Sequence, residues 1–197
     1  MMNDAKVTTR RWTTVEMVYV AMFSALMMIG ANITSFVPFL IVGGVPITLQ
    51  TFFAVLAGTL LGKRLGALSM IVYASLGLVG APVFARFSGG VGSILNPTFG
   101  FIISFIFTAY VVGWIVEKSQ KLSTYIIAAL VGTAINYLFG TNWMYVAYKV
   151  WAAAPEGFTY KLAWLWMLPP LPKDILLAIF AGWMAYRVTK TMKLRKK

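Results

Sequence analysis

The chain has 197 residues, of which 60% are hydrophobic and only 11% are charged, and its 17 Lys and Arg against 5 Asp and Glu give a net charge of +12. Soluble domains are about 45–50% apolar and about 25% charged, so this composition excludes an ordinary soluble domain, a disordered chain and a nucleic-acid-binding protein. Because there is no Cys and no His, disulfides, zinc sites built on those ligands and Ser–His or Cys–His pairs are also excluded.

The charge-free segments, taken in chain order, predict six membrane spans. A span needs about 20 apolar residues, and no charged residue lies between Glu16 and Lys63, so the first run is long enough for two spans. The predicted spans cover residues 16–37, 46–62, 66–81, 97–116, 123–147 and 165–187. We therefore expect an all-α integral membrane protein that forms a single domain over residues 1–197.

The basic residues predict how these spans are oriented. Cytoplasmic segments of membrane proteins are enriched in Lys and Arg. With a cytoplasmic N-terminus, all but four of the basic residues fall on the cytoplasmic side: Lys6, Arg10, Arg11, Lys63, Arg64, Lys118, Lys121, Arg187, Lys190, Lys193, Arg195, Lys196 and Lys197. The outer four are Arg86, Lys149, Lys161 and Lys173. The pattern predicts a multi-pass cell-membrane protein with both termini in the cytoplasm.

Three connections, at 38–45, 82–96 and 148–164, then face outward, and the second contains Phe84 and Arg86 among several glycines. Glycine permits backbone turns that other residues rarely make. One interpretation is a plain turn with a solvated Arg86. The other is a lid or wall over a ligand, in which the Arg86 guanidinium meets an anion.

Polar residues at span ends supply the other candidate ligand contacts. Lys173 and Asp174 open the last span after a proline-rich stretch. An acid suits the positive end of a helix dipole and a lysine can extend to the interface, but an ionisable group near bilayer depth usually has a partner or a function. Gln50 at the start of the second span and Asn142 in the fifth are amides that need a partner, either another helix or a ligand.

Together these side chains describe a pocket for a small anionic molecule with a polar head and an apolar body. No nucleophile with an adjacent base is present among them, so binding or transport is favoured over catalysis, with no metal and no cofactor. On the first span, Ala21 and Ala25 are four residues apart and share a helix face, where small residues let another helix approach closely.

Several motifs, in one order along the chain, resemble those of the BioY family. They are Gly44-Val-Pro46-Ile-Thr48-Leu-Gln50, Ala57-Gly58, Leu61-Gly62 through Gly66 to Tyr73, Gly77-Leu-Val-Gly80-Ala-Pro82-Val-Phe84, Gly89-Gly90 and Pro97-Thr98-Phe-Gly100-Phe101. The similarity covers about residues 17–186. BioY proteins are the biotin-binding S components of energy-coupling-factor (ECF) transporters.

The resemblance implies a six-helix S-component bundle that captures biotin from the outside. It also implies partners in the bilayer, namely a transmembrane T component and two ATPase subunits, with Ala21 and Ala25 as the docking face. The chain itself would then be a substrate-binding subunit and not an enzyme. Three alternatives remain open: an S component for another vitamin, a membrane enzyme acting on lipid-linked substrates, and a scaffold subunit.

If the ligand is biotin, its chemistry can be matched to the candidate residues. Asp174 is expected to accept from the two N–H groups of the ureido ring. An amide, either Asn142 or Gln50, would meet the ureido carbonyl, and a cation, either Arg86 or Lys173, would meet the tail carboxylate. Phe84 and neighbouring aromatics would cover the thiophane ring.

Overall fold

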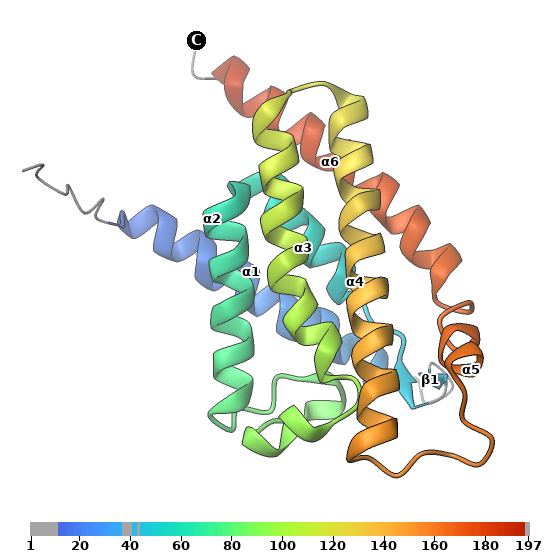
Figure 1. Cartoon of the computed structure of the whole chain (residues 1–197). Coiled ribbons are helices and arrows are strands. Elements are labelled where there is room, and N and C mark those ends of the chain that lie inside the picture. Colours follow the sequence, from blue (N-terminus) through green and yellow to red (C-terminus); the bar gives the residue numbers. More distant parts are fainter. Residues whose placement is uncertain (1–11, 37–40, 43, 196–197) are drawn as a thin grey trace, which may run out of the picture.

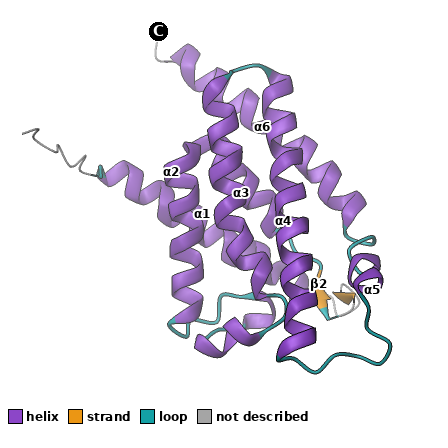
Figure 2. Ribbon diagram, viewed as in Figure 1, coloured by secondary structure: helices purple, strands orange, loops and turns teal. Residues whose placement is uncertain are grey.

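The computed structural model of the chain describes residues 12–36, 41–42 and 44–195. Half of the predicted outer connection at 38–45 lies outside the described residues, as do the basic residues Lys6, Arg10, Arg11, Lys196 and Lys197. Within the described part the chain is mainly helical, with one pair of two-residue antiparallel strands (Figure 2).

The helices form an elongated bundle crossed by an oblique first helix (Figure 1). In chain order the elements are α1 (Thr14–Asn32), the 3-10 turn η1 (Ile33–Phe36), β1 (Ile41–Val42), β2 (Val45–Pro46), α2 (Gln50–Leu78), η2 (Ala85–Phe87), η3 (Val91–Leu95), α3 (Phe99–Lys118), α4 (Leu122–Val150), α5 (Tyr160–Leu165) and α6 (Leu171–Arg195). The start of α1 is fixed by a capping box, because the Thr13 hydroxyl accepts from the Glu16 N–H and the Glu16 carboxylate accepts from the Thr13 N–H.

Helix α2 turns back on itself at Gly62. The backbone there has φ 78° and ψ 176°, a combination that is essentially limited to glycine. A Cβ added to Gly66 would lie 2.9 Å from the Cα of Gly58, so the two arms, 50–61 and 63–78, pack side by side. At 1.5 Å per residue the first arm is about 18 Å long, which is shorter than the roughly 30 Å hydrocarbon core.

The tip of this hairpin is held against the end of α3. The Glu117 carboxylate accepts from the Lys63 N–H at 3.1 Å and forms an ion pair with the Lys63 ammonium at 2.9 Å. Gly113 leaves the room for this approach, because a Cβ there would lie 2.2 Å from the Lys63 nitrogen. The basic tip of α2 and the α3–α4 connection therefore lie at the same end of the bundle.

Small residues make the other helix crossings close. A Cβ on Gly58 would meet the backbone of Ala109 in α3, and one on Gly182 in α6 would meet the backbone of Ile126 in α4. Without a hydrophobic driving force between helices in lipid, such close packing is what holds membrane helices together. Large apolar side chains such as Val18, Leu138 and Leu176 instead face outward, which suits contact with lipid chains.

Four helices in the described part are long and apolar enough to cross a membrane, namely α1, α2, α3 and α4. The six predicted spans correspond in order to α1, the two arms of α2, α3, α4 and α6, with shifted bounds. Residue 46 ends β2 and residues 47–49 form an irregular connection, so the second segment begins at Gln50. The last segment was expected at 165–187, whereas α6 begins at Leu171 and a separate short helix, α5, ends at Leu165.

The two ends of the bundle differ in character. The α3–α4 connection and the C-terminal end of α6 lie at one end, and the strands, α5 and the 79–98 segment lie at the other, here called the loop end (Figure 1). The predicted cytoplasmic residues Lys118, Lys121 and Arg187 are at the first end, whereas Arg86 and Lys173 are at the loop end.

Candidate functional site

A cavity of about 560 Å³ lies at the loop end of the bundle, within the size range of small-molecule sites. Its walls come from the β2–α2 segment (44–51), the 84–98 loop, the start of α3, the middle of α4 and the residues that open α6. Segments distant in sequence therefore meet around one space.

The acidic side chain of the cavity is Asp174, in the first turn of α6, and it is buried. Its Oδ1 lies 2.9 Å from the Lys173 ammonium, and its Oδ2 accepts from the Tyr137 hydroxyl at 2.7 Å. Lys173 also donates to the Thr48 carbonyl, which ties α6 to the segment before α2. The carboxylate is thus fixed from two sides before any ligand arrives.

Two buried amides line the cavity above the core. Gln50 donates through Nε2 to the Tyr73 hydroxyl at 2.8 Å. Asn136 accepts from the Thr51 hydroxyl and donates to the Ser104 hydroxyl at 2.6 Å. Because an amide has two N–H donors and one acceptor oxygen, Gln50 keeps one N–H for a further partner, while the groups of Asn136 join α2, α3 and α4.

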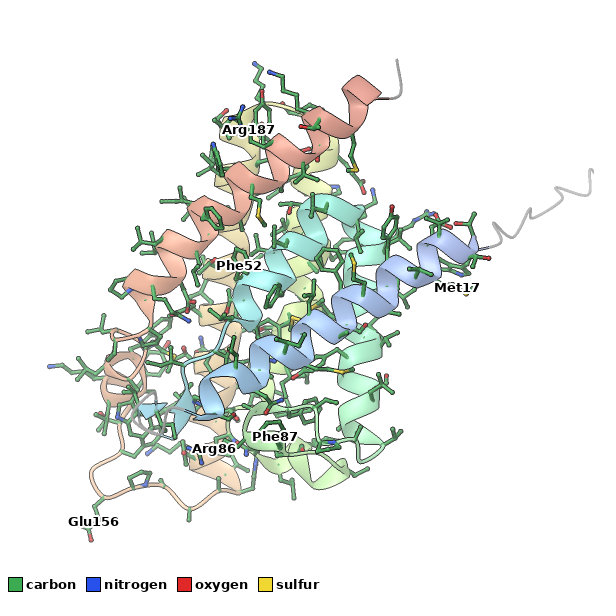
Figure 3. All side chains as sticks on the ribbon, turned by 180° about the vertical axis from the view of Figure 1, so that it is seen from behind. Met17, Phe52, Arg86, Phe87, Glu156 and Arg187 are labelled. Carbon is green, nitrogen blue, oxygen red and sulfur yellow. The ribbon has the colours of Figure 1, made fainter. Side chains whose placement is uncertain are left out.

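Phe84 and Arg86 line the cavity from the 84–98 loop, and Figure 3 shows where Arg86 lies in the fold. Phe84 is 2% exposed and packs edge-on against Tyr73 at 5.5 Å between ring centroids. The Phe84 ring can occupy this position only because residue 77 is glycine, since a Cβ there would lie 2.1 Å from the ring. Arg86 is exposed, and its side chain forms no hydrogen bond or ion pair with any residue that the structure describes.

The charges around the cavity do not cancel. Its charged lining residues are Arg86, Lys173 and Asp174, and the last two already form an ion pair. Arg86 is left as an unpaired positive charge at the wall, among the described residues. A cavity of this kind favours a ligand with an anionic group.

Of the six residues predicted to contact a ligand, Asp174, Lys173, Arg86, Gln50 and Phe84 line this cavity. Asn142 does not. It is exposed on α4, donates to the Leu138 carbonyl at 2.7 Å and accepts from the Tyr160 hydroxyl at 3.2 Å. Its amide therefore serves the α4–α5 contact, and it is not brought together with the other five.

Tyr137 was not among the residues predicted to contact a ligand, although it lines the cavity and orients Asp174. The available signal was its position next to Asn136 on the inner face of α4. Thr51 was also missed. Within the described residues no group of three Asp or Glu residues could hold a metal ion.

Ala21 and Ala25 lie away from the cavity, on α1. Both are exposed, as is Met22 beside them. The two small residues thus form part of an open helix face that a partner helix could reach.

Comparison with known proteins gives one consistent result. The BioY family model matches residues 2–194. The BioYB protein of Bacillus subtilis (strain 168) is 44% identical over 179 residues, which are 90% of this chain and 88% of that protein. "Probable biotin transporter BioY" of Pyrococcus horikoshii is 40% identical over 173 residues, covering 88% of this chain and 95% of the relative.

A solved structure is also similar. It is described as the S-component for biotin from an ECF-type ABC transporter, and it superposes with a TM-score of 0.74 at 25% sequence identity. The match covers 91% of this chain and 95% of that chain. The similarity therefore extends over most of the bundle.

Proposed function

This chain belongs to the BioY family, and from that premise we propose that it is a biotin-binding S component, the substrate-capture subunit of an ECF-type uptake transporter. The observation that carries the proposal is that Asp174 is a buried carboxylate at the wall of a cavity large enough for a small molecule. Two further features support it: the Arg86 cation on the same cavity, which has no ionic partner among the described residues, and a similar protein of known structure described as the S-component for biotin.

The ureido head of biotin is assigned to Asp174. A carboxylate has about four acceptor positions on its two oxygens, and Tyr137 and Lys173 occupy one on each oxygen. Two positions stay available for the two ureido N–H donors. Hydrogen bonds to a charged acceptor are the stronger kind, so this pair would supply much of the head-group recognition.

The remaining biotin groups are matched by elimination. Asn142 lies outside the cavity, so Gln50 is the amide assigned to the ureido carbonyl, through its second N–H. Lys173 is engaged by Asp174 and by the Thr48 carbonyl, so the tail carboxylate is assigned to Arg86. Phe84 is assigned to the thiophane ring as an apolar wall.

Transport is assigned to an assembly with partner subunits, because the similar solved structure is described as one component of an ECF-type ABC transporter. A transmembrane T component would dock on the Ala21 and Ala25 face of α1, and two ATPase subunits would supply the energy. In this assembly the loop end faces the outside and both termini face the cytoplasm. The excess of basic residues at the opposite end, such as Lys118 and Arg187, supports this orientation.

The proposal is tested by thermal unfolding of the purified protein in detergent with biotin, thiamine or riboflavin. A ligand that binds only the folded state stabilises it, by about 2.7 kcal/mol at a hundredfold excess over its Kd. Biotin is expected to raise Tm while the other two vitamins leave it unchanged. If saturating biotin leaves Tm unchanged, or if another vitamin alone raises it, biotin is not the ligand.

A further inference from the structure

Asn32, the last residue of α1, forms hydrogen bonds with the loop that carries Arg86. It is 7% exposed, and its amide bonds to both ends of the 83–87 segment. The side-chain Nδ2 donates to the Val83 carbonyl at 3.2 Å, and Oδ1 accepts from the Phe87 N–H at 2.8 Å. A primary amide carries a donor and an acceptor on one planar group, so a single side chain closes this segment into a loop.

The loop needs such a support because its backbone is strained. Arg86 has φ 61° and ψ 32°, and Phe87 has φ 54°. These left-handed conformations are unfavourable for residues other than glycine, and two occur here in succession. A second contact, from η1, acts on the same residues, since the Ser35 hydroxyl accepts from the Arg86 N–H at 3.1 Å.

This conformation determines where the Arg86 side chain goes. Arg86 and Phe87 lie beneath the C-terminal end of α1 in the view of Figure 3. The Arg86 side chain lines the cavity. Were residues 86 and 87 to relax into ordinary backbone regions, the direction of the Arg86 side chain from the loop would change. Phe84 would keep its own anchor, because it is packed against Gly77 and Tyr73 independently of Asn32.

We infer that Asn32 is a positioning residue that holds Arg86 toward the cavity and thereby sets the preference for a substrate with a free carboxylate. Asn32 contacts no ligand in this scheme and acts only through the backbone of residues 83–87. The inference rests on the proposed function, since it assigns the tail carboxylate to Arg86. It extends that function by identifying Asn32 as the residue on which recognition of the biotin tail carboxylate depends.

The test compares biotin with its uncharged methyl ester, by calorimetry on the full-length purified protein. The measured quantity is the Kd of the ester divided by the Kd of the acid. In the unmodified protein we expect a ratio of about tenfold or more, the usual value of a charge-assisted hydrogen bond. Arg86→Gln should bring the ratio close to one by weakening binding of the acid alone.

Asn32→Ala should lower the same ratio, and the double variant with Arg86→Gln should lower it no further than Arg86→Gln alone. Ser35→Ala, which removes a single bond to the loop, should lower it partially and serves if Asn32→Ala does not fold. The matched control is Ser24→Ala. Ser24 is a buried polar residue of α1 that bonds to the Val20 and Ser69 carbonyls and not to the loop, so its loss should leave the ratio unchanged.

A general loss of stability would weaken both ligands equally and leave the ratio unchanged, so the ratio separates positioning from a structural role. The inference is overturned if Asn32→Ala and Ser35→Ala both keep the full ratio while Arg86→Gln abolishes it. It is also overturned if Arg86→Gln keeps the ratio, because Arg86 then does not meet the carboxylate. If neither ligand binds the unmodified protein, the proposed function itself has failed.

Discussion

Replacing Asp174 by Asn should weaken biotin binding more than any other single change at the cavity. Asn keeps the shape and one oxygen, so the Tyr137 hydroxyl still has an acceptor. The negative charge is lost, and with it two charge-assisted bonds to the ureido head. We expect a loss of about 1–3 kcal/mol, or about 5–150-fold in Kd. Calorimetry with biotin and with its methyl ester measures this loss.

Both ligands should lose affinity by the same factor in Asp174→Asn, because they share the ureido head. The folded state should suffer little, since the Lys173 side chain is 32% exposed and keeps its bond to Thr48. Glu156→Gln is the matched control, because Glu156 is an exposed acid at the loop end and does not line the cavity (Figure 3). Unchanged biotin affinity in a folded Asp174→Asn protein would remove Asp174 from the site, and a loss confined to the acid would show that it contacts the tail.

Three further changes test other parts of the structure. Tyr137→Phe removes the bond that orients Asp174 and should raise the biotin Kd about 2–10-fold; an unchanged Kd would mean that the carboxylate needs no such support. Gly62→Ala places a side chain at φ 78° and should lower the unfolding free energy in detergent by about 1–3 kcal/mol. The control, Gly92→Ala, has open space around it and should leave the unfolding free energy unchanged. Equal stability of the two variants would contradict the claim that the turn at residue 62 requires glycine. Ala25→Trp should leave biotin binding intact and abolish co-purification with the T component and ATPase subunits, and retained co-purification would argue against this docking face.

Much of the fold follows from sequence because lipid imposes long apolar helices with few charges. The segments between Glu16 and Lys63 and after Lys121 illustrate this, since their charge-free lengths predict helices close to those observed. The spans predicted at 46–62 and 66–81 place a connection at 63–65, but they do not predict that the chain reverses at the single residue Gly62. Loops were expected at basic residues, but a single glycine with a positive φ reverses the chain just before Lys63, and hydropathy carries no information on backbone angles.

The candidate site, like the fold, could be predicted from the sequence only in part. Asp174 and Arg86 stood out because charges are rare in this chain and each lies beside a proline- or glycine-rich segment. Asn142 lies apart from the other five residues for a reason that helix geometry explains. It follows Tyr137 by five residues, which at 3.6 residues per turn is a rotation of about 140°, so when Tyr137 faces the cavity Asn142 faces away. The contacts of Asn32 could not be predicted, because they join residues more than 50 positions apart.

Equilibrium dialysis of the purified full-length protein against radiolabelled biotin tests the central claim most directly. The cavity predicts saturable binding of one biotin per chain, displaced fully by unlabelled biotin and poorly by its methyl ester. Absence of saturable binding by folded protein would contradict the claim that this chain captures biotin.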